Sequence, residues 1–279
     1  MPDPSNVSYP LPFESATVMS PLIDISVDGH VHTRLCNHAT GEMEEYVEMA
    51  VQRGLATIIF LEHLEAEILY HPRSWLEKAE FDAYFQEGAR LKERYRGSID
   101  VRLGVEAGYN REALPVLRDK LAQYPWDRIG LSCHFHRHDT THLNLLSRRQ
   151  ESLARLAALG VDRVVTDYLD SLIEAVGVLD CNVLCHLDAV LRHYPGIRFT
   201  ADHRQQIELL LDSMQAKGVA LEINTSGFAY RGFPFPASWI IQGALARGIP
   251  LYAGSDAHQP GEVGRYFDQL PAYLEEIQD

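Results

Sequence analysis

Short apolar runs alternate with longer amphipathic segments along most of the chain. The runs are rich in Val, Ile and Leu and do not alternate strictly between apolar and polar positions. This pattern is typical of parallel strands that are covered on both faces. The predicted strands are residues 23–27, 56–61, 99–105, 128–132, 182–185, 219–223 and 249–254.

The segments between these runs carry apolar residues at helical spacing with charged residues between them. Gly54, Gly218 and Gly248 stand where helices should end, and Thr200 stands where one should begin. The predicted helices are residues 42–53, 77–95, 112–123, 151–178, 201–217 and 236–247. This alternation favours a parallel α/β fold, and a closed barrel of seven or eight units suits the length better than an open sheet.

Composition limits the classes of function. The 279 residues include 46% hydrophobic and 23% charged residues, which is enough for a sizeable core. The formal net charge of -14 argues against binding an extended nucleic acid through a broad basic face. No glycine-rich phosphate-binding motif follows the first strand, which argues against a dinucleotide-binding protein and against a P-loop nucleotide-binding protein.

The start of the chain and the cysteines indicate where the protein works. Residues 1–22 lack the basic and apolar regions of a signal peptide and are expected to form an N-terminal arm before one barrel domain, residues 23–279. No apolar stretch is long enough to span a membrane. The four cysteines form no CxxC pair, so we expect reduced thiols and a cytoplasmic location.

Histidines and carboxylates follow the predicted strands one after another. In a parallel barrel these positions gather at one end, where barrel enzymes carry their active sites. Each piece also has an ordinary structural interpretation: a lone His63 could be a hydrogen-bonded core histidine, and Glu106 could cap the next helix. Their joint placement is harder to explain without cations, because crowded buried carboxylates and imidazoles are costly unless they are neutralised.

The candidate ligands are imidazoles and carboxylates without thiolates. This mixture favours zinc, iron or manganese over magnesium or calcium. The number of candidates exceeds the needs of one tetrahedral ion and suits two or three divalent ions. They are His30, His32, His38, His63, Glu106, His134, His186, Asp256 and His258.

Several motifs resemble the PHP (polymerase and histidinol phosphatase) superfamily. These are DGHVHTRLCNH from Asp28, LEH at residues 61–63, GVEAGY around Glu106 and LSCHFH around His134. The later CHLDAVLR, LEINTSGF and GSDAH are similar to the histidinol-phosphate phosphatase branch in particular. The resemblance covers nearly the whole chain and implies a distorted (β/α)7 TIM-like barrel of the PHP type with a trinuclear metal site.

The resemblance also implies how the ligands are shared among three ions. One ion would be held by His30, His32, Glu106 and Asp256. Glu106 would bridge to a second ion completed by His134 and His186. The third ion would be held by His38, His63 and His258.

The substrate-binding residues of the family match this sequence less closely than its metal ligands do. The histidinol phosphatase branch often has an arginine shortly after the fifth-strand HxD motif, where Arg192 stands, and another after the NTSG turn, where Arg231 is the nearest match. Arg231 could equally be a solvated loop residue. His136 belongs to a histidine-rich stretch, residues 136–142, that departs from the branch and could face the substrate or form a polar lid.

The expected reaction is hydrolysis of a small phosphate monoester by a metal-activated hydroxide, with L-histidinol phosphate as the substrate that the resemblance implies. Arg192 would stabilise the phosphate oxygens, and Asp188 is a candidate acid for the leaving alcohol or a group that orients His186. The alternative is a PHP-type phosphodiesterase or nucleotidase acting on a nucleotide or short oligonucleotide.

Two further classes rank lower. Amidohydrolase-type barrels usually rely on a lysine at the fourth strand, and none is near His134. Purely structural zinc sites are closed and commonly thiolate-rich, unlike this set. The expected partner is a small phosphorylated molecule and not a membrane, while aromatic residues near Tyr230 are compatible with a homo-oligomer.

Overall fold

The computed structural model describes residues 22–278, so the predicted arm over residues 1–22 lies almost wholly outside the described residues. Seven parallel strands form one sheet in the order β1-β2-β3-β4-β7-β8-β9. These strands are β1 (Val27–Val31), β2 (Thr57–Leu64), β3 (Asp100–Gly108), β4 (Arg128–Ser132), β7 (Val183–Leu184), β8 (Ala220–Asn224) and β9 (Leu251–Gly254). The predicted parallel barrel is therefore confirmed.

The two edges of the sheet meet just beyond β1 and β9, which nearly closes the barrel. The His32 amide donates to the Ala257 carbonyl at 2.9 Å, and the Asp256 amide donates to the His30 carbonyl at 2.9 Å. The Asp28 carboxylate accepts bonds from the Ser255 amide at 3.0 Å, the Ser255 hydroxyl at 2.6 Å and the Gly264 amide at 2.7 Å. Asp28 thus ties β1 to the segment after β9.

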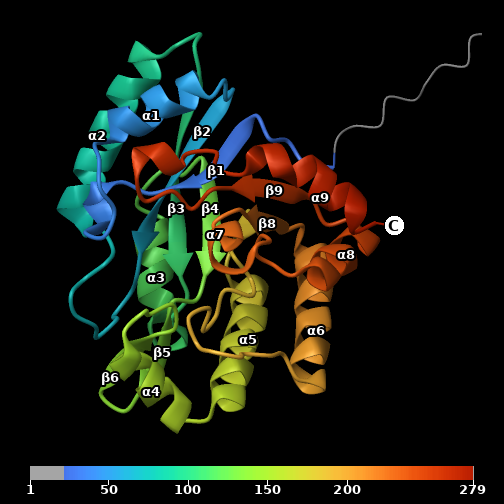
Figure 1. Cartoon of the computed structure of the whole chain (residues 1–279). Helices are drawn as coiled ribbons and strands as arrows, with labels where there is room; N and C mark the ends of the chain where they lie inside the picture. Colours follow the sequence, from blue (N-terminus) through green and yellow to red (C-terminus); the bar gives the residue numbers. More distant parts are fainter. Residues whose placement is uncertain (1–21, 279) are drawn as a thin grey trace, which may run out of the picture.

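Helices surround the strands, and the strands cross the middle of the molecule (Figure 1). The α-helices are α1 (Met43–Gln52), α2 (Lys78–Arg94), α3 (Leu114–Leu121), α4 (Gln150–Ala158), α5 (Val161–Val178), α6 (Ala201–Lys217), α7 (Gly227–Arg231), α8 (Ser238–Ala246) and α9 (Leu270–Glu276). Short 3-10 turns are Arg34–Cys36, Arg111–Ala113, Pro260–Glu262 and Phe267–Gln269. Among residues 22–278, no helix combines the length and the apolar character needed to cross a bilayer.

Burial follows the expectation for a parallel barrel. Every residue of β2 is buried, because helices cover it outside and other strands face it inside. A small apolar cluster of Ile59, Leu61, Val183, Cys185 and Ala220 is separate from the larger core that includes most of the helices' buried residues.

The structure adds α7 and α9, which were not predicted, and it differs from the predicted elements in three further places. β1 begins at Val27, where the predicted strand ended, because Asp28 and His30 are polar but fully buried with their own partners. The predicted helix 151–178 is broken at Gly160, whose φ of +91° ends α4 before α5 begins.

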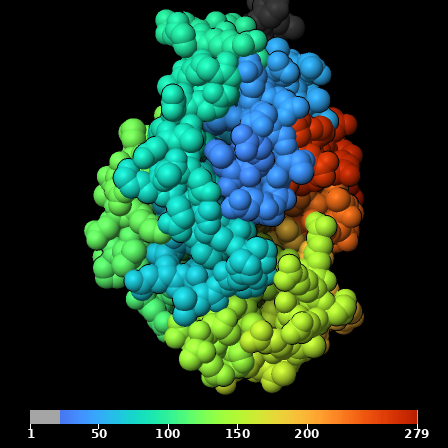
Figure 2. Space-filling model, turned by 90° about the vertical axis from the view of Figure 1, so that its left-hand side faces the viewer, coloured from blue at the N-terminus to red at the C-terminus, as the bar shows by residue number. Residues whose placement is uncertain are grey.

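The third departure is an antiparallel hairpin within the histidine-rich stretch. Strands β5 (Phe135–His138) and β6 (Thr141–Asn144) pair with each other and lie outside the barrel sheet. In the space-filling view the yellow-green segment that contains this hairpin and α4 forms the lower edge of the face, below the teal and blue segments (Figure 2). The hairpin thus adds a projection beside the barrel that apolar periodicity did not indicate.

Candidate metal centre

All nine predicted ligands lie at the carboxyl ends of the barrel strands or in the loops that follow them. Seven of them line one cavity of about 360 Å³, namely His38, His63, Glu106, His134, His186, Asp256 and His258. The other two, His30 and His32, are completely buried beside this cavity.

Glu106, on β3, lies at the centre of the cluster. Its Oε1 is 2.8 Å from His186 Nε2 and 3.1 Å from His134 Nε2. Its Oε2 is 2.9 Å from His63 Nδ1 and 3.5 Å from His30 Nε2. Each carboxylate oxygen therefore faces a different group of imidazoles, so Glu106 could be shared by two ions.

Asp256 and the HxH pair of β1 form a second grouping. The Nε2 atoms of His30 and His32 lie 2.9 Å apart. Asp256 Oδ1 lies 3.9 Å from His30 Nε2 and 3.5 Å from His32 Nε2. The three residues offer ligand atoms within 4.8 Å of one another and are all buried.

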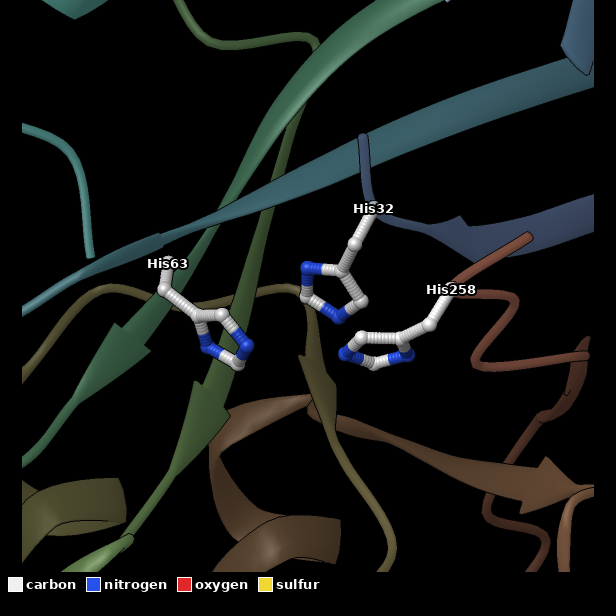
Figure 3. A group of neighbouring side chains, drawn as sticks. All are labelled: His32, His63 and His258. Atoms are coloured by element: carbon white, nitrogen blue, oxygen red, sulfur yellow. The ribbon is translucent and has the colours of Figure 1, made fainter. Parts of the chain in front are cut away.

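A third grouping lies at the outer side, where three histidines converge (Figure 3). His32 follows β1, His63 lies on β2 and His258 follows β9. The rings of His32 and His63 stack with their centroids 4.2 Å apart, and the ring centroid of His258 lies 4.5 Å from that of His32. His38 joins through its Nε2, which is 2.9 Å from His258 Nε2. His32 therefore lies against two of these groupings, not only beside the residues of the first set that the resemblance implies.

Three histidines of the outer grouping, His32, His38 and His63, are held in the neutral form that binds metals. Burial lowers the pKa of His32 well below its usual value, and the nearby His63 and His258 lower it further. For the same reasons the pKa of His38 falls to about 3. Burial also brings the pKa of His63 to about 4, although Glu106 opposes this shift.

The two carboxylates are held in the ionised form. Burial by itself would raise the pKa of Glu106, but His134 and neighbouring imidazoles outweigh it and hold that pKa well below its usual range. Asp256 behaves in the same way, with His32 and His258 opposing the effect of burial on its pKa.

The site therefore presents negative charge beside the free imidazole lone pairs of His32, His38 and His63. At His30 and His134 burial favours the neutral ring, but Glu106 and the carboxylates behind these histidines outweigh it, raising the pKa of His30 well above its usual value and that of His134 to about 10.

The donor distances fit divalent transition metals. Ligands about 2.0–2.1 Å from an ion lie about 2.9 to 3.4 Å from one another in octahedral or tetrahedral coordination. Several of the distances above fall in or close to this range. Among the described residues, Glu106 Oε2 and His32 Nδ1 are also buried without a hydrogen-bond partner, although His63 Nδ1 approaches Glu106 closely.

Two glutamates that are not among the nine predicted ligands contact these histidines on the side away from the cluster. Glu222 Oε1, on β8, is 2.6 Å from His30 Nδ1, and its Oε2 accepts the His186 amide at 2.7 Å. Glu65 Oε1 is 2.9 Å from His134 Nδ1. Such carboxylates keep the proton on Nδ1 and leave Nε2 free for a metal. At Gly254 a Cβ would lie only 2.2 Å from Glu222 Oε1, so this position needs glycine.

The backbone is strained at two ligands. His186 has a φ of +27° and Asp256 a φ of +51°, both in the left-handed region that side chains rarely adopt. Strain of this kind persists where surrounding contacts enforce it and often marks a functional site. The Glu222 bond to the His186 amide is one such contact.

We expect Glu222→Gln to weaken metal binding about 10–100-fold, the usual effect of losing a group that orients a ligand. A glutamine that keeps its oxygen toward His30 turns its NH₂ toward the His186 amide, so that two donors face each other. Competition with a chromogenic chelator measures the dissociation constant, with Glu276→Gln at an exposed position as the control. Equal affinity in both variants would contradict this role for Glu222.

The remaining predicted residues are divided between the cavity and other places. Arg192 lines the metal cavity. Asp188 and Arg231 instead pair with each other, at 2.9 Å and 3.1 Å, and Asp188 also accepts the Ala237 amide. His136 lines a separate cavity of about 330 Å³. The chain turns sharply after His186, so Asp188 does not follow it toward the metal ligands.

The chain matches known proteins over most of its length. The PHP domain matches residues 28–226, and the PHP-associated region matches residues 240–279. The histidinol-phosphatase of Bacillus subtilis (strain 168) is 30% identical to this chain over 266 residues, which cover 89% of this chain and 98% of the relative.

Two solved structures share the fold. A crystal structure from Listeria monocytogenes superposes with a TM-score of 0.79 at 20% identity, over 87% of this chain and 99% of that chain. Histidinol phosphate phosphatase from Lactococcus lactis, complexed with Zn, L-histidinol and phosphate, gives a TM-score of 0.71 at 21% identity, over 90% and 93% of the two chains. The match of the PHP domain to residues 28–226, together with the relative from Bacillus subtilis, shows that the chain belongs to the PHP domain family.

Proposed function

We propose that this protein is a metal-dependent phosphatase that hydrolyses a small phosphate monoester, L-histidinol phosphate, to L-histidinol and phosphate. The relative from Bacillus subtilis, which is aligned over nearly its full length, supports this substrate. The imidazole and carboxylate cluster supports the metal dependence. The same activity would place the protein in histidine biosynthesis.

The observation that carries the proposal is a half-buried arginine with unsatisfied N–H donors beside the predicted metal ligands. Arg192 lines the metal cavity, and its side chain is only 14% exposed. Its Nε and Nη1 have no hydrogen-bond partner among the described residues, and Nη1 lies 3.9 Å from Asp256 Oδ2. A half-buried guanidinium beside metal ligands is suited to bind an anion in a bidentate way, as a phosphate requires.

The division of tasks follows from this geometry. Bound divalent ions would supply a water of lowered pKa and neutralise charge on the phosphate. Arg192 would bind phosphate oxygens on the side of Asp256. Glu222 and Glu65 would keep His30 and His134 in the tautomer that ligates. The paired Asp188 and Arg231 would anchor the α7 loop from behind the cavity.

We infer two or three ions per chain, of zinc, iron or manganese. Nine donors are more than one ion can use, and Glu106 is placed to serve two ions at once. His38, His63 and His258 are then available for a third ion. The four cysteines are unpaired in the structure, in keeping with a reducing cytoplasm.

We also infer that residues 23–279 work as one catalytic domain. β9 lies inside the PHP-associated match, yet it completes the barrel of the preceding match. The last two predicted ligands, Asp256 and His258, follow β9 directly.

The test is phosphate release from L-histidinol phosphate, beside a panel of other monoesters, with purified protein loaded with zinc or manganese. We expect a kcat/KM of about 10⁴ M⁻¹s⁻¹ or more on L-histidinol phosphate, as enzymes commonly show on their own substrates. Weak release from every monoester would overturn the proposal.

We expect Arg192→Ala to raise KM and lower kcat, with a total loss in kcat/KM of about 10–100-fold. This is the effect of removing a hydrogen bond to a charged group. Arg198→Ala removes the same charge at an exposed site and serves as the control. An unchanged kcat/KM in Arg192→Ala would remove this residue from the phosphate site.

A further inference from the structure

One ion pair cross-links the loop that follows β9. Glu262 ends a short 3-10 turn in this loop, and its Oε1 lies 2.9 Å from Arg265 Nη1. The other oxygen of Glu262, Oε2, accepts the His258 amide at 2.9 Å. Arg265 donates from Nε to the Ser255 carbonyl at 3.0 Å and from Nη2 to the Asp256 carbonyl at 3.2 Å. The pair therefore bonds to the backbone of both predicted ligands in this loop, Asp256 and His258.

Arg265 lines the metal cavity, as Arg192 does, but its donors are engaged. Each of its three nitrogens has a partner within the loop, whereas Nε and Nη1 of Arg192 have none among the described residues. The side chains of Arg265 and Glu262 are only 19% and 30% exposed. A guanidinium whose nitrogens are all engaged is suited to hold the backbone in place, and not to bind substrate.

The bonds of Arg265 lie on both sides of a strained residue. Asp256 has a φ of +51°, in the left-handed region. The Ser255 carbonyl belongs to the peptide group before the Asp256 Cα, and the Asp256 carbonyl belongs to the peptide group after it. One guanidinium thus fixes both peptide groups, which is how surrounding contacts keep such a conformation in place.

The Asp256 carbonyl also sets the tautomer of His258. It accepts a bond from His258 Nδ1 at 3.0 Å, which keeps the proton on Nδ1 and leaves Nε2 for a metal. In Figure 3 one ring nitrogen of His258 points toward the other histidines, and the other points away from them. Nε2 lies 2.9 Å from His38 Nε2, and His38 Nδ1 bonds in turn to the Cys36 carbonyl at 2.9 Å. Two such Nε2 lone pairs repel each other unless a cation or a proton lies between them.

We propose that Glu262 and Arg265 are positioning residues that hold His258 ready for the third ion, which it would share with His38 and His63. This rests on the proposed metal-dependent function. Arg265 fixes the carbonyl to which the His258 ring bonds, and Glu262 fixes the His258 amide. The two residues act on the ion only through His258 and the backbone beside it.

The charge of Arg265 and its hydrogen bonds have opposite effects on metal affinity. A guanidinium beside the cavity repels bound cations, so its charge by itself weakens their binding. Arg265→Met removes the charge and the bonds but keeps most of the length of the side chain. A dominant charge effect would make this variant bind zinc more tightly, whereas the positioning role predicts weaker binding. The sign of the change therefore separates the two.

The test measures each step of zinc binding by chelator competition in the wild type, Glu262→Gln and Arg265→Met. The step that disappears in His38→Ala identifies the third ion, because His38 belongs to no other predicted set. In both variants we expect this step to weaken about 10–100-fold, the usual effect of losing a group that orients a ligand. In Glu262→Gln the other steps should stay within about threefold of the wild type.

Glu275→Gln, at an exposed position on α9, is the matched control and should bind zinc as the wild type does. Arg265→Met should also weaken the ion that Asp256 would hold, because it loses both carbonyl bonds.

Urea unfolding of the chelated variants separates positioning from a general structural role. A structural role would lower the unfolding midpoint of the chelated protein and leave every zinc step unchanged. That result would overturn the positioning role, as would tighter zinc binding in Arg265→Met or a wild type in which His38→Ala removes no step. A wild type whose third zinc ion depends on Glu262 and Arg265, but which releases phosphate from no monoester, would overturn the proposed function alone.

Discussion

Glu106→Gln is expected to reduce kcat by at least about a thousandfold. Metal ions in such sites contribute several kcal/mol of transition-state stabilisation, and three powers of ten correspond to about 4 kcal/mol. Glu106 approaches five imidazoles, and each of its oxygens faces a different group: His134 and His186 lie beside Oε1, and His30, His32 and His63 lie beside Oε2. The glutamine keeps the shape but loses the negative charge and presents an NH₂ group to one of these groups.

The measurement combines steady-state turnover with metal content after dialysis, determined by mass spectrometry. We expect fewer bound ions per chain in Glu106→Gln, together with the loss of rate. Glu93→Gln is the control, because its side chain is 68% exposed on α2. A Glu106→Gln protein that keeps its ions and its rate would show that Glu106 does not bridge metals.

Asp28→Asn is expected to lower the free energy of unfolding by about 2–4 kcal/mol. The Asp28 carboxylate is fully buried and accepts bonds from the Ser255 amide, the Ser255 hydroxyl and the Gly264 amide. An asparagine offers one oxygen and one NH₂ group, so a buried donor is left facing another donor. The closure of the barrel between β1 and β9 should therefore loosen.

Urea unfolding of the chelated protein measures this loss without a contribution from bound metal. Asp24→Asn is the matched control, since the Asp24 carboxylate accepts bonds from Ser26 but is exposed. We expect the control to change stability by less than about 0.5 kcal/mol. Equal unfolding midpoints and slopes for the two variants would contradict the closing role of Asp28.

The barrel and the cluster of ligands could be predicted because both depend on short-range patterns. Apolar runs give parallel strands, and parallel strands carry whatever follows them to the same end of the sheet. Glu106 and His134 therefore both line the cavity, as their positions at the ends of two predicted strands indicated. β4 and α6 were predicted at their observed bounds, with Thr200 and Gly218 as caps of the helix.

The partners of these residues could not be predicted, because they are remote in sequence and depend on side-chain direction. Glu222 is 192 positions from His30, and nothing in local sequence links them. Glu222 and Asn224 stand at the end of the sixth predicted strand, and the alternation along β8 places them on the same side of it, but neither signal shows that Glu222 contacts His30. The pairing of Asp188 with Arg231 is likewise a product of the turn after His186.

The histidine-rich hairpin is a second feature that could not be predicted from the sequence. Residues 135–144 have few apolar positions in helical or strand periodicity, and β5 and β6 pair with each other outside the barrel. Phe135 and Asn144 from this hairpin nevertheless line the metal cavity, with Arg148 just beyond it. Its contribution to the site becomes visible only when the fold places it there.

The most direct test of a divalent-metal phosphatase is a titration of metal-free protein with zinc or manganese, followed by phosphate release from L-histidinol phosphate at each ratio. We expect no turnover without metal, and a rate that rises and then becomes constant at two or three bound ions per chain. Turnover that persists in the metal-free protein, or no turnover at any ratio, would contradict the account.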